Sequence, residues 1–130
     1  LAVVGAHLSG MPLNHQLVSR GASFVERTTT SGGYRLHAIP GTVPPKPGLE
    51  RLAPGLTGKP IEVELWDVPL GLFGSFLAEV PPPLGIGSVE LSDGRVVKGF
   101  ICEGFALGNA RDITAFGGWR SYLASLSAPH

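Results

Sequence analysis

The residue types and spacings with the clearest chemical potential lie near the start of the chain, in the segment GAHLSGMPLNHQL (residues 5–17). It follows the short apolar run LAVV and combines glycines with a serine and two histidines. A turn between a strand and a helix exposes backbone N–H groups that bind anions, and glycine lets the backbone approach such a ligand closely. A helix is expected to begin at Pro12 and to end just before Gly21. The dipole of such a helix adds about half a positive charge at its N-terminus, beside the turn. The pattern predicts that Gly5, Ala6, Leu8, Ser9 and Gly10 form an anion-binding turn. The alternative is a turn that only connects the strand to the helix.

Two histidines in this segment are candidate proton donors. Imidazole has an unperturbed pKa of about 6.5, so histidine is the natural general acid near neutral pH. His7 lies inside the predicted anion-binding turn, whereas His15 lies roughly opposite the helix face shared by Leu13 and Leu17. We therefore expect His7, ahead of His15, to act on a bound anion. For His15 the alternative is a solvated side chain.

A second negative charge on such a ligand needs a cation. Arg35 lies on a predicted strand, on the same face as His37, and its planar guanidinium is suited to a two-pronged carboxylate contact. Lys46 lies in a proline-stiffened loop that would hold it over a pocket. For both residues the alternative is ordinary solvation.

Other site chemistries have little support in the sequence. Ser9, His7 and Asp112 would form a nucleophilic triad only if the fold brought them together, and any chain with several serines offers such sets. A zinc site from His7, His15 and His37 would need ligands from separate elements, without a ligand spacing to support it. We expect neither a metal nor a cofactor.

Composition indicates one globular domain. The 130 residues are 43% hydrophobic and 15% charged, which argues against disorder, while 19 glycines and 12 prolines require many short strands and turns. Zero formal net charge argues against a nucleic-acid partner, and no apolar run approaches the roughly 20 residues that cross a membrane. The single cysteine, Cys102, is expected to be a small buried hydrophobe, and with no signal peptide the chain is expected to be cytoplasmic. Because it begins at Leu1 rather than methionine, we expect a piece of a longer protein.

Hydrophobic periodicity predicts a mixed α+β fold. Strands are expected in residues 1–4 and 61–69, in a hairpin over residues 22–39, and in a second hairpin around Asp93-Gly94. Residues 42–60 read as an extended loop, and helices are expected between Pro12 and Gly21, over residues 70–80 and over residues 116–126. Asp112 is expected to cap the last helical segment at Thr114 or Ala115. The sum is a largely antiparallel sheet, closing into a small barrel, with three short helices.

Four stretches resemble the C-terminal domain of allophanate hydrolase: VVGAHLSGMPLNHQL, YRLHAIPGTVPPKPGL, PLGIGSVELSDGRVVKGFICE and ARDITAFGGWRSYL. The resemblance runs in order from Val3 to Leu123 and implies a γ-glutamylcyclotransferase-like fold, a small mixed β-barrel with flanking helices. In that superfamily a turn after the first strand cradles a carboxylate, and GAHLSG stands at the matching place. The catalytic glutamate of the cyclotransferases has no counterpart in PPPLGIGS, which disfavours their reaction here.

The resemblance also implies a function in urea degradation. Allophanate hydrolases join an amidase domain to this C-terminal domain, which converts N-carboxycarbamate to CO₂ and ammonia by decarboxylation. The amidase signature is absent from these residues, so we expect no amidase activity, a small dianionic substrate at the first turn, and the amidase domain of the same polypeptide as partner. One alternative is a non-catalytic module that docks on the amidase domain or stabilises a homo-oligomer of the parent enzyme. A cyclotransferase-like enzyme is the weaker alternative.

Overall fold

Eight strands form two sheets in the computed structural model, which describes residues 1–127. The larger sheet has the order β2 (Ser23–Thr29), β5 (Glu62–Asp67), β1 (Ala2–Val3), β7 (Val96–Cys102), β6 (Leu84–Glu90). The smaller sheet has the order β4 (Lys46–Arg51), β3 (Tyr34–Ile39), β8 (Arg111–Asp112). β1 and β7 run parallel and the other pairs are antiparallel, which confirms the mixed, largely antiparallel α+β fold. Within the described residues the strands form two hydrogen-bonded sheets rather than one closed barrel.

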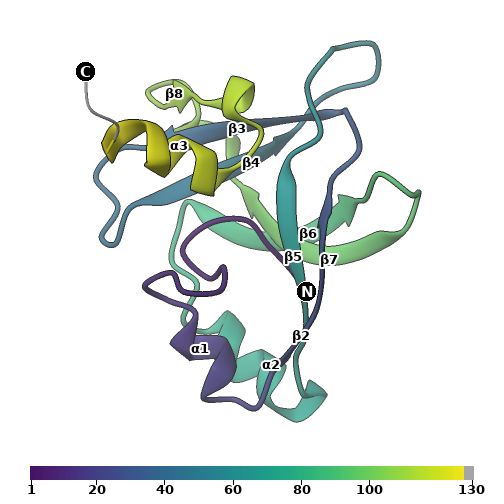
Figure 1. The fold of residues 1–130 in the computed structure, drawn as a ribbon, viewed down its shortest axis with the longest axis vertical. Coiled ribbons are helices and arrows are strands. Elements are labelled where there is room, and N and C mark those ends of the chain that lie inside the picture. Colours follow the sequence, from purple (N-terminus) through teal and green to yellow (C-terminus); the bar gives the residue numbers. More distant parts are fainter. Residues whose placement is uncertain (128–130) are drawn as a thin grey trace.

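The helices are short and lie at opposite ends of the molecule (Figure 1). α1 (His15–Val18) and α2 (Leu70–Leu77) lie together, joined by Arg20, which forms a 2.6 Å ion pair with Glu79 and donates to Ser75. α3 (Trp119–Ser127) lies beside the smaller sheet, preceded by two 3₁₀ turns, η1 (Gly104–Ala106) and η2 (Thr114–Phe116). None of the described helices is long and apolar enough to cross a membrane.

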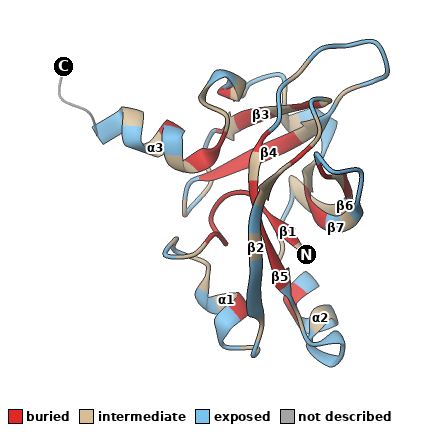
Figure 2. Ribbon diagram, turned by 45° about the vertical axis from the view of Figure 1, so that its right-hand side comes forward, coloured by how far each residue is buried: buried red, intermediate tan, exposed pale blue. Residues whose placement is uncertain are grey.

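β1 places the first turn at the centre of the molecule. It has only two residues, yet it is buried because β5 flanks it on one side and β7 on the other. Figure 2 shows β1, β3 and β4 largely buried, whereas much of the edge strand β2 is exposed. The chain therefore leaves the middle of the larger sheet directly into the turn, so this turn is surrounded by protein.

Several local predictions are confirmed. β6 and β7 form the hairpin around Asp93-Gly94, where Gly94 has φ +91°, a backbone conformation that glycine adopts without strain. Asp112 accepts a 2.9 Å hydrogen bond from the Thr114 N–H, as expected of a cap. The helices predicted over residues 70–80 and 116–126 are present as α2 and as η2 followed by α3.

Two predictions about longer segments are wrong. Residues 22–39 do form two strands, but they do not pair with each other: β2 pairs with β5 and β3 with β4. The predicted loop over residues 42–60 contains β4, in which Pro47 lies opposite Ala38. Alternation in the sequence shows that a segment is extended, but the partner strand is chosen by non-local burial.

The predicted start of the first helix is also wrong. α1 begins at His15 rather than at Pro12 and has four residues, because hydrogen-bonded turns occupy the preceding segment. The Met11 N–H donates to the Leu8 carbonyl at 2.9 Å and the Leu13 N–H to the Ala6 carbonyl at 2.8 Å. A helix this short, starting this late, supplies no dipole to the turn.

Candidate functional site

The first turn forms one wall of a cavity between the two sheets. The lining residues come from the turn, from β4 and its start, and from β6 and β7: Val4, Gly5, Ala6, His7, Lys46, Pro47, Leu84 and Phe100. The cavity volume is about 10 Å³, room for one water-sized group. A second cleft of about 220 Å³ shares Lys46 and Leu84 with it and is otherwise lined by residues 41–43 and 81–83. The two spaces therefore adjoin at Lys46 and Leu84.

The His7 ring is buried and held on three sides. It is stacked on Phe100, with ring centroids 4.8 Å apart, and meets the edge of Phe76 at 5.3 Å. Its Nε2 lies 2.7 Å from the Gln16 Oε1. An amide oxygen only accepts, so Nε2 is the protonated nitrogen that donates this bond. In the neutral ring, Nδ1 is then the atom that can take up a proton.

The surroundings of His7 favour its neutral form. Burial is the largest influence and lowers the pKa of His7 below its ordinary value, while the hydrogen bond to Gln16 opposes this shift. The positive charge of Lys46 lowers the pKa further. His7 is therefore a neutral imidazole at pH 7 until a negative charge arrives beside it.

Three backbone donors of the turn are free. The N–H groups of Gly5, Ala6 and His7 donate to no acceptor within residues 1–127, and all three residues line the cavity. Gly5 also lies against Pro47: a Cβ at this position would come within 2.2 Å of the Pro47 Cδ. The absence of a side chain at Gly5 thus lets β4 approach the turn and bring Lys46 with it.

Lys46 supplies the positive charge of the cavity. The residue is only 7% exposed, and it forms no ion pair within residues 1–127. Because its positive charge has no counterion among the described residues, the ammonium is available to an anion that enters the cavity. The residues that carry the free N–H groups, the ammonium and the imidazole thus line one small space.

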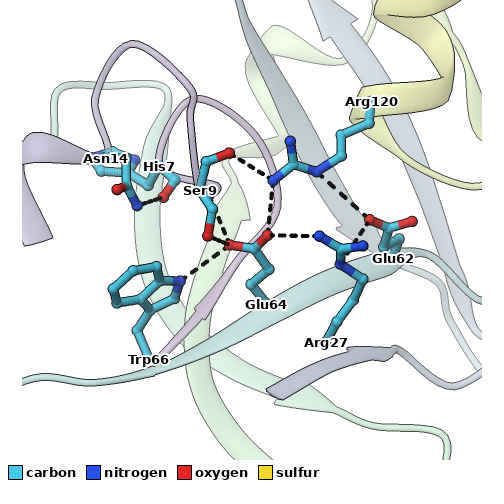
Figure 3. A network of polar contacts seen from close by, with 8 residues as sticks. All are labelled: His7, Ser9, Asn14, Arg27, Glu62, Glu64, Trp66 and Arg120. Carbon is cyan, nitrogen blue, oxygen red and sulfur yellow. Dashed lines mark hydrogen bonds and ion pairs between the residues drawn. The ribbon is translucent and has the colours of Figure 1, made fainter. Parts of the chain in front are cut away.

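The other half of the turn already holds a carboxylate, that of Glu64 in β5 (Figure 3). The backbone N–H and the hydroxyl of Ser9 donate to one Glu64 oxygen at 2.8 and 2.9 Å, and the Trp66 indole donates at 3.2 Å. Arg120 donates to the other oxygen at 2.8 Å. Burial alone would raise the pKa of Glu64, but these hydrogen bonds outweigh it and hold the pKa below its ordinary value.

The remaining predicted residues lie outside the cavity. His15 is exposed and its Nδ1 donates to the Pro12 carbonyl at 3.0 Å, while Gly10 lies near it on the surface. Leu8 is buried in the core and its N–H donates to the Gly5 carbonyl. Arg35 does not line the cavity; its charge acts on Asp112. The structure thus brings together Gly5, Ala6, His7 and Lys46, and separates them from His15, Ser9, Gly10 and Arg35.

Sequence reasoning missed Glu64, Arg120 and Phe100. Alternation in IEVELWDV placed Glu64 on the same face as Trp66 without showing that this face is buried. The available signal was a carboxylate at the centre of a strand between Val63 and Leu65, which must find hydrogen-bond donors if it is buried. Nothing local to Arg120 or Phe100 indicates their roles, because both reach the first turn from about a hundred residues away.

The chain is a small α+β domain whose first strand opens into a glycine-containing turn between two sheets. The sequence model of the allophanate hydrolase C-terminal domain matches residues 1–124. The chain belongs to this family.

Individual relatives agree with this assignment. The urea amidolyase of Saccharomyces cerevisiae is 49% identical over 129 residues, which are 97% of this chain and 7% of that protein. The structure of Kluyveromyces lactis allophanate hydrolase superposes with a TM-score of 0.91 at 48% identity, over 96% of this chain and 21% of that one. A uropathogenic E. coli-specific protein, c4763, has a TM-score of 0.86 at 34% identity and covers 95% of this chain and 93% of its own. The chain thus spans a small part of the first two relatives and nearly all of the third.

Proposed function

We propose that this domain decarboxylates N-carboxycarbamate, the product of allophanate hydrolysis, within a urea-degrading hydrolase. The observation that carries the proposal is that Lys46, His7 and a turn with three free N–H groups line the same cavity. The names of the relatives supply the context, because urea amidolyase and allophanate hydrolase act on urea and allophanate.

Binding follows from charge. The substrate is a nitrogen flanked by two carboxylates, and an oxygen of one carboxylate would enter the cavity to meet the free N–H groups of residues 5–7. The second would lie toward the neighbouring cleft, where Lys46 forms a shared wall. Of the two cations considered from the sequence, Lys46 lines the cavity and Arg35 does not. We therefore assign the second carboxylate to Lys46.

The chemical step needs a proton on nitrogen. The C–N bond to one carboxylate breaks, its electron pair goes to nitrogen, CO₂ leaves, and the nitrogen takes one proton to give carbamate. Carbamate then takes a second proton and releases ammonia and a second CO₂. Because the dianion raises the pKa of a neighbouring imidazole, substrate binding draws a proton to His7, which delivers it from Nδ1. General acid help of this kind is typically worth about 10²- to 10⁴-fold in rate.

The test generates N-carboxycarbamate in place with the amidase half of an allophanate hydrolase and follows CO₂ release. Adding this chain should accelerate release, His7→Ala should abolish the acceleration, and the exposed Lys98→Met serves as a control. The chain alone should release no ammonia from allophanate, since we assign it no amidase nucleophile. Acceleration by folded His7→Ala equal to that of the unsubstituted chain would refute the assignment.

A second candidate function is docking on the amidase domain of the same polypeptide. Large apolar side chains are exposed on β2 and α2, among them Phe24, Val25 and Leu70. A docking module would change the stability or assembly of a truncated amidase when added in trans, and His7→Ala would do so as well as the unsubstituted chain. The decarboxylase proposal requires the two chains to differ in CO₂ release.

A further inference from the structure

The buried Glu64 carboxylate connects three distant parts of the chain. It lies in the middle of β5, its side chain is 0% exposed, and it accepts hydrogen bonds from the first turn, from its own strand and from α3. Arg27, on β2, adds an ion pair at 3.6 Å. Neither Glu64 nor Arg120 lines the cavity that holds His7. The proposed decarboxylation therefore assigns no role to this network.

Arg120 contacts the turn directly as well as through Glu64. One guanidinium nitrogen donates to the Ser9 carbonyl at 2.8 Å and to Glu64 at 2.8 Å. Ser9 in turn gives its N–H and hydroxyl to Glu64. Both peptide groups that flank Ser9 are thus fixed, as the close-up in Figure 3 shows.

The fixed residue lies only two positions from His7. The His7 carbonyl accepts a 2.9 Å hydrogen bond from the Asn14 side chain, and the Leu8 N–H donates to the Gly5 carbonyl at 3.0 Å. The segment from Gly5 to Ser9 is therefore closed by its own turn bond and held at its far end by Arg120 and Glu64. The direction of the free N–H groups of residues 5–7 depends on these anchors.

We propose that Arg120 is a positioning residue for the His7 site: it holds the Ser9 end of the turn so that the N–H groups of residues 5–7 face the cavity. The proposal rests on the proposed function for its catalytic consequence. Its geometric part, that Arg120 fixes the turn, stands independently. The charges of Glu64, Arg120, Arg27 and Glu62 sum to zero, so the network acts on His7 by geometry rather than by net charge.

A merely structural role makes a different prediction. If Arg120 only neutralises Glu64, the double variant Glu64→Gln/Arg120→Met removes both charges together. It should then recover the stability, the malonate affinity and the slow Leu8 amide exchange that Arg120→Met loses. If Arg120 positions the turn, the double variant regains resistance to urea but still lacks the donor to the Ser9 carbonyl. The exposed Arg95, whose partners are Asp93 and Glu26, supplies the control Arg95→Met.

The experiment measures three quantities on this chain and its variants: urea unfolding, malonate binding by calorimetry, and exchange of the Leu8 amide by NMR. Malonate is a stable dicarboxylate of the substrate's shape. We expect Arg120→Met and the double variant to exchange the Leu8 amide at least about tenfold faster and to bind malonate about tenfold or more weakly, since small misplacements in a site are costly. Arg95→Met should match the unsubstituted chain.

Each possible result supports or refutes either the positioning role of Arg120 or the proposed function. Recovery of malonate affinity in the double variant, or unchanged affinity in Arg120→Met, would overturn the positioning role. If the unsubstituted chain neither binds malonate nor accelerates CO₂ release, the proposed function fails, and Leu8 exchange alone then judges the geometric claim. Faster exchange in both Arg120 variants upholds it, and unchanged exchange refutes it.

Discussion

Ser9 gives both its backbone N–H and its hydroxyl to a single oxygen of Glu64, at 2.8 and 2.9 Å. A turn predicted to bind a carboxylate therefore binds one belonging to the chain itself. The two ends of the segment from Gly5 to Ser9 therefore differ in role. Ser9 is held by Glu64, whereas the backbone N–H groups of residues 5–7 have no acceptor within residues 1–127 and belong to residues that line the cavity.

Glu64→Ala should destabilise the fold by about 3 kcal/mol, the lower end of the range for breaking a buried ion pair, because Arg120 is itself partly exposed. Ser9 and Trp66 would also lose their acceptor. Urea unfolding measures the change. Glu90→Gln removes a carboxylate from a more exposed 3.6 Å pair with Arg51 and should shift stability by no more than about 0.5 kcal/mol. Equal effects of the two substitutions would contradict the importance of the Glu64 network.

Gly5→Ala should distort the cavity. The new methyl group would lie within 2.2 Å of Pro47, so the turn and β4 must move apart at a cost of about 1–3 kcal/mol. Malonate affinity should fall along with stability. Gly108→Ala is the matched control, since no atom lies within 4 Å of its added methyl group and its φ is not positive. Normal malonate binding by Gly5→Ala would indicate that the ligand binds outside this cavity.

The stability of the chain should depend on pH through His7. Burial lowers the pKa of His7 in the folded state, so the unfolded chain, with a histidine pKa of about 6.5, binds a proton first as the pH falls. The free energy of unfolding should therefore decrease as pH falls from about 6.5 to the folded-state pKa. His7→Gln should remove this part of the pH dependence in urea titrations. An NMR titration that gives His7 a pKa above 6.5 would contradict the expectation.

Malonate binding at pH 7 should be accompanied by proton uptake. The neutral His7 becomes protonated when a dianion binds beside it, and the observed binding enthalpy should then vary with the ionisation enthalpy of the buffer. His7→Gln should bind without this proton. Binding by the unsubstituted chain that is independent of buffer would show that His7 does not sense the ligand.

Lys46→Met should separate stability from binding. Replacing a largely buried lysine that has no ion pair within residues 1–127 by an apolar side chain of similar length should leave the free energy of unfolding unchanged or raise it, whereas malonate should bind about 10- to 100-fold more weakly. Lys98 is exposed, and its ammonium donates to the Ser88 hydroxyl. The control variant Lys98→Met should therefore bind malonate normally. A marked loss of stability in Lys46→Met would indicate a structural role for the ammonium instead.

Local features of the fold can be predicted from the sequence alone. LAVV followed by a glycine-containing turn, the Asp93-Gly94 hairpin and the Asp112 cap depend on backbone sterics and on hydrogen bonds between near neighbours, so their residue types predict them. The α+β class followed from hydrophobic periodicity. His7 and Lys46 were recognised as candidates from their residue types.

Which of the candidate residues lie together depends on contacts between distant parts of the chain. Pairing of β3 with β4, rather than with β2, brings Lys46 to the turn, and the burial of both faces of β5 carries Glu64 to Ser9. Strand partners and buried carboxylates are selected by contacts between residues distant in sequence, which compete over the whole chain. Local patterns cannot rank those contacts, because the free energy of each depends on what the rest of the fold excludes from water.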